Sequence, residues 1–145
     1  MARTEDLIDI LGGAQVLKSG AGAGADLLRE RIGAGLPFRS LESVRARLGL
    51  TVPETASVLH MPERTMARRR QARRLAADES DRLYRIARIV AYAMDVLGSE
   101  ANAVAWLRRP NRGFGGAAPL QHLDTDLGTR QIEEMLGRLA HGVIG

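Results

Sequence analysis

Arginine side chains are concentrated in one short stretch of the sequence, residues 61–75. This stretch, MPERTMARRRQARRL, holds six Arg and one Glu, a balance of 6 − 1 = +5, whereas the whole 145-residue chain carries only +4. Guanidinium groups bind phosphates and can fork onto guanine bases, so a local excess of them favours a polyanionic partner. The stretch therefore predicts a contact with nucleic acid.

The same stretch has the layout of a helix-turn-helix. Residues 53–60 (PETASVLH) predict a short helix that ends in a tight turn at His60 and Met61. Pro62 is expected at the first position of the helix that follows, because its fixed φ suits that position. In a helix-turn-helix the second helix enters the major groove of DNA.

Individual side chains of that second helix are suited to DNA. Thr65, near the N-terminus, is expected to bond a phosphate with help from the helix dipole. Arg64 and Arg68 lie four residues apart on one face, and either can fork onto guanine. The alternative is that this charged face is only solvated. A single helix-turn-helix binds DNA weakly, so a homodimer is expected on operator DNA. The expected phosphate contacts are the rest of the basic cluster: Arg69, Arg70, Arg73 and Arg74.

A second unusual stretch is WLRRPNRGFGGAAPL, residues 106–120, which holds the only Trp and a cluster of Gly and Pro. Ordering such a loop is entropically unfavourable, because glycine loses more backbone freedom on folding than other residues. In one interpretation Trp106 anchors the core and the glycines make a tight connection. In the other the loop docks a protein, with Trp and Arg as anchors and the bare backbone beside Asn111 presenting amide groups. The residues alone leave both open.

Helical periodicity dominates the chain and predicts an all-α fold, because no window shows sustained strand-like alternation. Residues 81–98 carry one apolar stripe, so a long helix is expected there, with Asp78 or Ser80 as its N-cap and Gly98 as its end. A shorter helix is expected over residues 99–108.

A last helix is expected between Thr125, its predicted N-cap, and Gly142. In the first third, short helices are expected over 5–13 and 25–38, separated by the flexible glycine-rich linker KSGAGAGA, and a third helix begins at a predicted Ser40 cap. The apolar face expected on the last helix consists of Leu127, Ile132, Met135, Leu136 and Leu139.

Several kinds of site are not supported by the sequence. The chain has no Cys, which excludes disulfides, thiol nucleophiles, iron–sulfur clusters and Cys-ligated zinc. The three His show no metal-ligand spacing, and no nucleophilic or acid–base constellation is recognisable. Gly20, Gly22 and Ala25 satisfy G-x-G-x-x-A, but without a preceding strand they predict only a linker. We expect no enzyme activity, no metal and no bound cofactor.

The sequence also carries no sign of a membrane or export segment. Acidic residues interrupt the first apolar ones, and the longest uncharged apolar stretch, residues 89–94, is too short to span a bilayer. We therefore expect a cytoplasmic protein with no membrane contact.

The C-terminal half resembles a known family. Its marks occur in order at Ser80-Asp81-Arg82-Leu83, Trp106-Leu107, Pro110-Asn111, Gly115-Gly116, Pro119-Leu120, Thr125, Gly128 and Gly142. They resemble the toxin-binding domain of MbcA/ParS/Xre antitoxins, and upstream Gly35-Leu36-Pro37 and ERTMARRRQARRL resemble the Xre-like helix-turn-helix half of the same proteins. The resemblance implies an N-terminal helix and linker over 1–27, a helix-turn-helix region over 28–78 and a toxin-binding domain over 79–145.

The resemblance also implies a partner. Such antitoxins are encoded beside a RES-domain toxin that consumes NAD⁺ or uses it for ADP-ribosyl transfer. By resemblance the chain binds that toxin, blocks its NAD⁺ pocket and, within a hetero-oligomeric complex, represses its own operon; the NAD⁺ belongs to the toxin. The implied toxin-binding residues are Trp106, Arg109, Pro110, Asn111, Arg112, Phe114, Gly115, Gly116, Arg138 and Gly142.

Two departures from the family pattern stand out. Phe114 occupies a position where the family usually has Leu, and the tail VIG carries no charged side chain to reach into a toxin pocket. Two other functions stay open on the residues alone: a stand-alone helix-turn-helix regulator whose C-terminal half only dimerises, and a small enzyme with an unrecognised site.

Overall fold

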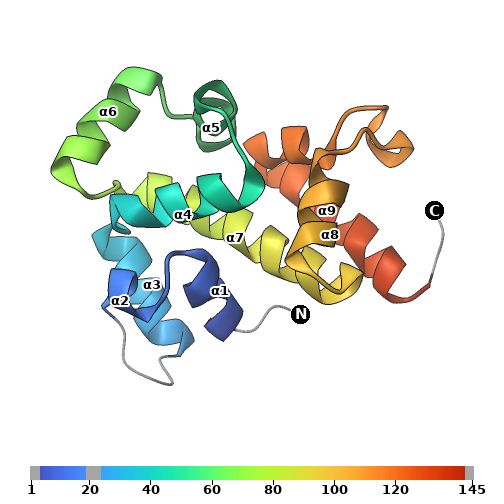
Figure 1. Cartoon of the computed structure of the whole chain (residues 1–145), viewed down its shortest axis with the longest axis horizontal. Coiled ribbons are helices and arrows are strands. Elements are labelled where there is room, and N and C mark those ends of the chain that lie inside the picture. Colours follow the sequence, from blue (N-terminus) through green and yellow to red (C-terminus); the bar gives the residue numbers. More distant parts are fainter. Residues whose placement is uncertain (1–3, 19–23, 143–145) are drawn as a thin grey trace.

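The computed structural model describes residues 4–18 and 24–142, and every regular element within those ranges is helical (Figure 1). The all-α prediction is confirmed. Gly20, Gly22 and the tail over 143–145 lie outside the described residues, and no described helix is long and apolar enough to cross a bilayer. The α-helices are α1 (Thr4–Ile10), α2 (Ala14–Leu17), α3 (Ala25–Ala34), α4 (Phe38–Leu48), α5 (Val52–Leu59), α6 (Glu63–Ala72), α7 (Ala77–Leu97), α8 (Glu100–Arg108) and α9 (Asp126–Ala140), with two 3₁₀ helices, η1 (Arg112–Phe114) and η2 (Pro119–Asp124), between the last two.

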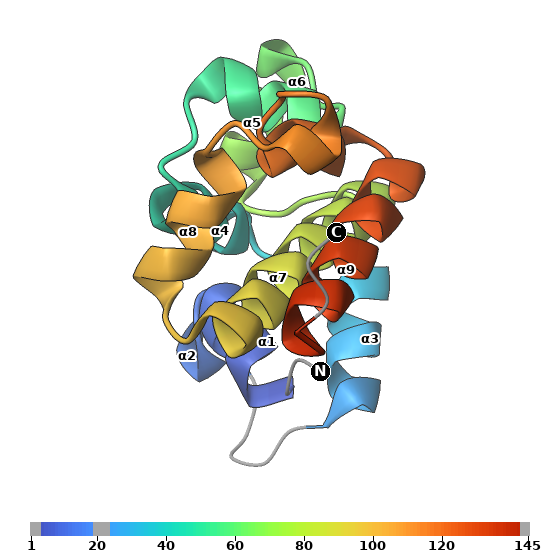
Figure 2. The same ribbon diagram turned by 90° about the vertical axis from the view of Figure 1, so that its right-hand side faces the viewer.

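The long helix α7 runs through the middle of the molecule and contacts elements from both halves of the chain. It packs against α1 and α3 from the N-terminal half and against α8 and α9 from the C-terminal half (Figures 1 and 2). Its predicted stripe is buried at Leu83, Ile86 and Val90, while Met94 and Leu97 are only partly buried. The two halves therefore share one apolar core, and α7 is the element that joins them.

The start of α7 differs from the prediction. Ala76 has the extended backbone of a cap, and Glu79 Oε1 accepts a hydrogen bond from the Ala76 N–H at 2.8 Å. The Ser80 hydroxyl is buried and instead accepts from the Leu36 N–H at 2.7 Å. The predicted caps at Asp78 and Ser80 are wrong because a glutamate three residues into the helix satisfies the first free amide.

The predicted cap at Ser40 is also wrong. Pro37, with an extended ψ of 147°, is the N-cap of α4, three residues before the predicted cap, so Ser40 lies buried inside the first turn. The capping box belongs to α5. There Thr51 Oγ1 accepts from the Glu54 N–H at 3.1 Å, and Glu54 Oε1 accepts from the Thr51 N–H at 2.9 Å. The residues TVPE, which fit the S/T-x-x-E pattern, are the sequence signal for it.

The last helix, α9, has its predicted cap but not its whole predicted apolar face. Thr125 Oγ1 accepts from the Gly128 N–H at 2.9 Å, and Ile132 and Leu136 are fully buried. Leu127 is 69% exposed and Leu139 38% exposed. Leu127 precedes Ile132 by five residues, which places it about 140° round the helix, so the predicted single face is wrong at this end.

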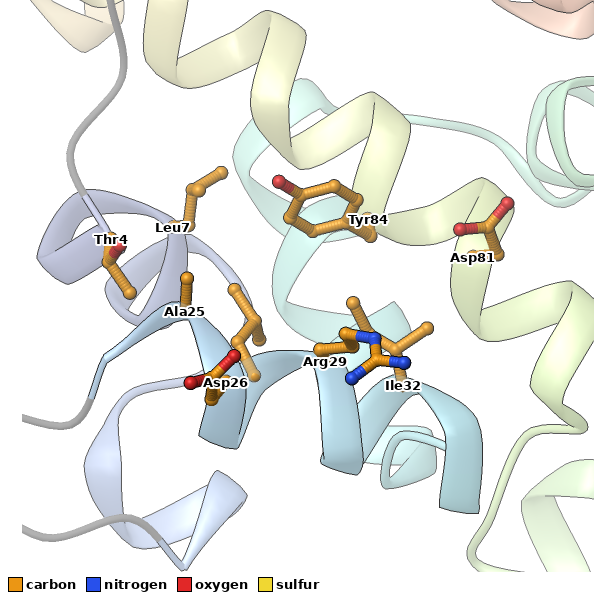
Figure 3. Close-up of a pocket in the computed structure, with 9 residues that line it drawn as sticks. Thr4, Leu7, Ala25, Asp26, Arg29, Ile32, Asp81 and Tyr84 are labelled. Carbon is orange, nitrogen blue, oxygen red and sulfur yellow. The ribbon is translucent and has the colours of Figure 1, made fainter.

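An apolar hollow of about 360 Å³ lies between α1, α3 and α7 (Figure 3). Leu7, Ile32 and Tyr84 line it, together with the exposed charged side chains of Asp81 and Arg29. Figure 1 shows α1 and α3 on the opposite side of the molecule from α6, so this hollow is separate from the basic helix.

Candidate functional site

The predicted helix-turn-helix forms from α5 and α6. His60 takes a left-handed backbone with φ 49° directly after α5, and buried Met61 follows, as the turn prediction requires. Pro62 has the extended ψ of 148° and precedes the helix as its cap instead of occupying its first position, so that prediction is wrong by one residue. The second helix therefore begins at Glu63.

The outer face of α6 carries both of the predicted base-reading side chains. Arg64 and Arg68 are exposed, whereas Met66, on the opposite face, is buried and holds the helix on the core. Thr65 is half-buried, and Arg68 Nη2 lies 3.4 Å from its hydroxyl oxygen. Arg64 and Arg68 are thus both exposed, as their spacing of four residues on one helix face predicts.

The flanks of α6 hold the other arginines in different ways. Arg69 Nε donates to Glu79 Oε1 at 2.8 Å, and this hydrogen bond and the charge of Glu79, which is only 5% exposed, raise the pKa of Arg69. The Arg70 guanidinium lies 5.3 Å from the centre of the Phe38 ring. Arg74 Nη1 donates to the carbonyl oxygen of Ala34 at 3.2 Å. The six arginines are thus divided between outward-facing and internally bonded positions.

Long-range contacts tie the helix-turn-helix to the C-terminal part. The ring of His60 hydrogen-bonds the carbonyl oxygen of Asp124, and Arg82 Nη1 donates to the Leu59 carbonyl oxygen at 3.1 Å. Arg108 pairs with Glu54 at 3.2 Å. The pKa of Glu54 is lowered chiefly by the hydrogen bond from the Thr51 N–H and further by Arg108. The sequence analysis does not predict these contacts, because the partners lie 23 to 64 positions apart in the chain.

The loop between α8 and η2, residues 109–118, is organised by Asn111. Asn111 Oδ1 accepts from the Gly113 N–H at 2.8 Å, its carbonyl oxygen accepts from the Phe114 and Gly116 N–H groups, and its own N–H donates to the Ala117 carbonyl oxygen at 3.0 Å. The Gly115 N–H donates to the carbonyl oxygen of the residue three before it. The N–H groups of the loop glycines are therefore used within the loop and are not left free for a partner.

Aromatic packing supports the loop from beneath. Phe114 is buried, with its ring edge-on to Trp106 at 6.3 Å and to His122 at 4.9 Å between ring centres. Trp106 is half-buried against the core. Trp106 therefore packs against the core, as the core-anchor interpretation predicts. Phe114 is buried beside it and supports the loop.

The remaining predicted toxin-binding residues are on the surface. Met135 connects the loop to α9: its methyl group fills the space where a Cβ on Gly113 would lie, and Arg138 Nη2 is 3.9 Å from its sulfur. Arg138 therefore lies near the loop, and Gly142 follows at the end of α9 with φ 72°. The exposed members of the predicted set are Arg109, Pro110, Arg112, Gly115, Gly116, Arg138 and Gly142.

The charge around the loop is not evident from composition. Residues 99–145 are balanced, with five Arg and five acidic residues. Three of those acidic side chains pair with arginines from elsewhere in the chain: Glu100 with Arg47, Asp126 with Arg85 and Glu133 with Arg88. The ion pairs of the described residues do not include Arg109, Arg112 or Arg138. The surface at the loop is therefore locally positive.

Comparison with known proteins identifies both halves. A family model described as the antitoxin Xre-like helix-turn-helix domain matches residues 27–88, and one described as the antitoxin Xre/MbcA/ParS C-terminal toxin-binding domain matches residues 93–142. The chain is 39% identical over 116 residues to the antitoxin Xre of Pseudomonas putida, covering 79% of this chain and 72% of that protein. The chain belongs to the Xre/MbcA/ParS antitoxin family.

Two further relatives agree with this assignment. The chain is 29% identical over 119 residues to the antitoxin Xre of Yersinia enterocolitica, covering 81% of this chain and 80% of that protein. It is 36% identical over 72 residues to the antitoxin Xre of Photorhabdus laumondii, about half of each chain.

This antitoxin of a type II toxin–antitoxin system thus combines a helix-turn-helix DNA-binding domain with a toxin-binding domain and is not an enzyme. The family resemblance stated from separated sequence marks is confirmed. The two matched segments come together within α7, between residues 88 and 93, whereas the boundary predicted after residue 78 stays a prediction.

Proposed function

We propose that this antitoxin neutralises a RES-domain toxin, which consumes NAD⁺ or transfers ADP-ribose, by covering the toxin's NAD⁺ pocket with the 109–118 loop and the end of α9. The observation that carries the proposal is a loop held rigid by Asn111 and Phe114 whose surface presents Arg109, Arg112 and Arg138 without acidic partners among the described residues. A preformed surface loses little conformational entropy when it binds, and arginine is a favoured interface anchor.

The predicted toxin-binding residues have two roles in this proposal. Trp106, Asn111 and Phe114 give the loop its shape from within, because their contacts are internal. Asn111 is consequently a poor probe of binding, since its replacement removes the hydrogen bond that its Oδ1 accepts from the Gly113 N–H inside the loop. The residues proposed to touch the toxin are Arg109, Pro110, Arg112, Gly115, Gly116, Arg138 and Gly142.

Co-expression with the toxin encoded beside this antitoxin tests the proposal. Arg112→Glu places a negative charge against the toxin surface that is proposed to bind a positive one. We therefore expect affinity for the toxin to fall about tenfold or more and toxicity to return. Arg29→Glu, an equal change of charge on exposed α3, is the matched control and is expected to protect cells as wild type does. Melting temperatures of both variants establish that the fold is intact.

The enzyme assay completes this test. NAD⁺ consumption by the purified toxin is expected to stop when wild-type antitoxin is added in excess and to persist with Arg112→Glu. A neighbouring gene without a RES domain, or a complex that still turns over NAD⁺, would contradict the proposal.

We also propose that the antitoxin represses its own operon as a homodimer within the toxin complex. Arg64 and Arg68 face outward from α6 and suit guanine, and Thr65, Arg70 and Arg73 suit the flanking phosphates. Arg69 is assigned to positioning α6, because its guanidinium is already bonded to Glu79. Two such helices about 34 Å apart match successive major grooves.

A further inference from the structure

A basic hollow lies on the flank of α6 that faces α4. It is a hollow of about 360 Å³ between the N-terminal turn of α4 and the C-terminal part of α6, and we refer to it as the α4–α6 hollow. Three arginines from the two helices and one carboxylate line it. The lining residues are Pro37, Phe38, Arg39, Glu42, Arg70 and Arg73.

Backbone contacts hold the two sides of the hollow together. The Phe38 N–H donates to the Arg73 carbonyl oxygen at 3.1 Å, and the Leu75 N–H donates to the Leu36 carbonyl oxygen at 2.8 Å. Gly35, with φ 97°, permits this close approach, because a Cβ there would collide with the carbonyl oxygen of Leu75. The arginines are therefore brought together by the fold and not by the sequence spacing of one helix.

The two flanks of α6 differ in free charge. On the α7 side, Glu79 neutralises Arg69 at 2.8 Å. On the α4 side, the ion pairs of the described residues include neither Arg39, Arg70 nor Arg73, and the Phe38 ring keeps the Arg70 guanidinium on this flank. Against these three positive charges stands the exposed carboxylate of Glu42. The hollow thus has a net charge of 3 − 1 = +2.

We propose that the α4–α6 hollow binds a phosphate of the operator backbone and that Arg39 is a DNA contact together with Arg70 and Arg73. This inference rests on the proposed entry of α6 into the major groove, which brings a flank of the helix to the phosphates that border the groove. Guanidinium groups bind phosphate oxygens in bidentate fashion, and a cluster from two elements fixes the position of the protein along the duplex. Glu42 weakens this contact by repulsion.

Binding to DNA tests the role of Arg39. The probes are a labelled duplex of the intergenic DNA upstream of the antitoxin gene and a random-sequence duplex of equal length. For Arg39→Gln we expect affinity for both to fall about five- to tenfold near 0.1 M salt, and the slope of log K against log salt to decrease by about 0.9 per subunit. The preference for the intergenic duplex is expected to stay, because a phosphate contact carries no base information.

Matched variants sharpen the test. Glu42→Gln removes the opposing charge and is expected to tighten both duplexes about two- to fivefold. Arg29→Gln, at an exposed arginine of α3 that does not line the hollow, is expected to bind as wild type does. Arg39 is exposed and makes none of the hydrogen bonds of the described residues, so Arg39→Gln is expected to fold normally.

The outcomes separate this inference from the proposed function. If Arg39→Gln keeps wild-type affinity and salt slope while Arg68→Gln loses binding, the hollow has no role and the role of α6 stands. If the wild-type protein binds neither duplex, both fail. Weaker binding by Glu42→Gln would also overturn the assignment of the hollow to a phosphate.

Discussion

The basic helix α6 and the 109–118 loop lie at opposite ends of the long axis of the molecule and present their surfaces by different means (Figure 1). Helix α6 has ordinary backbone hydrogen bonds and displays long charged side chains such as Arg64 and Arg68. The backbone path of the loop depends on the hydrogen bonds of Asn111, one from its side chain and three from its backbone, and on the buried ring of Phe114. Substitutions on the outer face of α6 should therefore change binding alone, whereas many loop substitutions should change the fold first.

The two regions are nevertheless parts of one framework. The His60 turn of the helix-turn-helix contacts the Asp124 carbonyl oxygen of η2, and Arg108 at the end of α8 pairs with Glu54 of α5. These side-chain contacts join the helix-turn-helix to the C-terminal part of the chain. Variants that change either the packing or the charge of one region, but not both, test how the two regions differ.

The largest effect is expected at Gly128 of α9, which packs against η2, the element that follows the loop. In Gly128→Ala the new methyl group would collide with the carbonyl oxygen of His122 in η2, a backbone atom that cannot move aside alone. We expect destabilisation of about 3 kcal/mol and loss of toxin binding. Gly137→Ala, in the same helix, would place its Cβ 3.4 Å from the Tyr92 hydroxyl oxygen, and we expect about 0.5–1 kcal/mol of added stability.

Thermal unfolding of the two glycine variants measures this difference. Equal melting temperatures for Gly128→Ala and wild type would mean that the path of η2 over α9 is not constrained as described.

An intermediate effect is expected within α6 itself. Arg68→Gln should lower the preference for the intergenic duplex by about tenfold and leave the melting temperature unchanged, because Arg68 is exposed. Arg69→Gln should lower the melting temperature, because Glu79 loses its partner, and should leave the salt slope of DNA binding close to that of wild type. Fluorescence anisotropy over a salt series, with calorimetry, provides both readings. A lower melting temperature for Arg68→Gln together with weaker DNA preference for Arg69→Gln would contradict the different roles assigned to the outer face and the flank of α6.

The smallest effect is expected for Glu54, which links the two regions. Its pKa in the folded state lies below its ordinary value of 4.5, so the carboxylate adds stability above about pH 4.5 that is lost as the pH falls through the folded-state pKa. Because Glu54 is partly exposed, we expect Glu54→Gln to remove less than about 1 kcal/mol at pH 7 and to flatten the acid side of the stability profile. Glu134→Gln, an exposed carboxylate on the same molecule, is the control. Identical profiles for wild type and Glu54→Gln would contradict this link.

Much of the fold follows from local sequence signals. Apolar spacing predicts α7, the His60–Met61 turn predicts the helix-turn-helix, and Thr125 predicts the start of α9, because each signal and its structural consequence lie within a few residues. The predictions that fail locally do so by competition. Thr51 and Glu54 make the capping box that Ser40 does not, and Glu79 caps α7 in place of its polar neighbours.

The order of residues by itself determined the all-helical fold class, the charge excess of α6 and the marks that identify the antitoxin family. Only the tertiary structure decided which arginines are free, that Phe114 lies beneath the loop, and that Arg39 stands beside Arg70 across the α4–α6 hollow. Periodicity and capping act over one or two helical turns, so a sequence records them directly. Burial and ion pairing depend on partners that folding brings from distant parts of the chain.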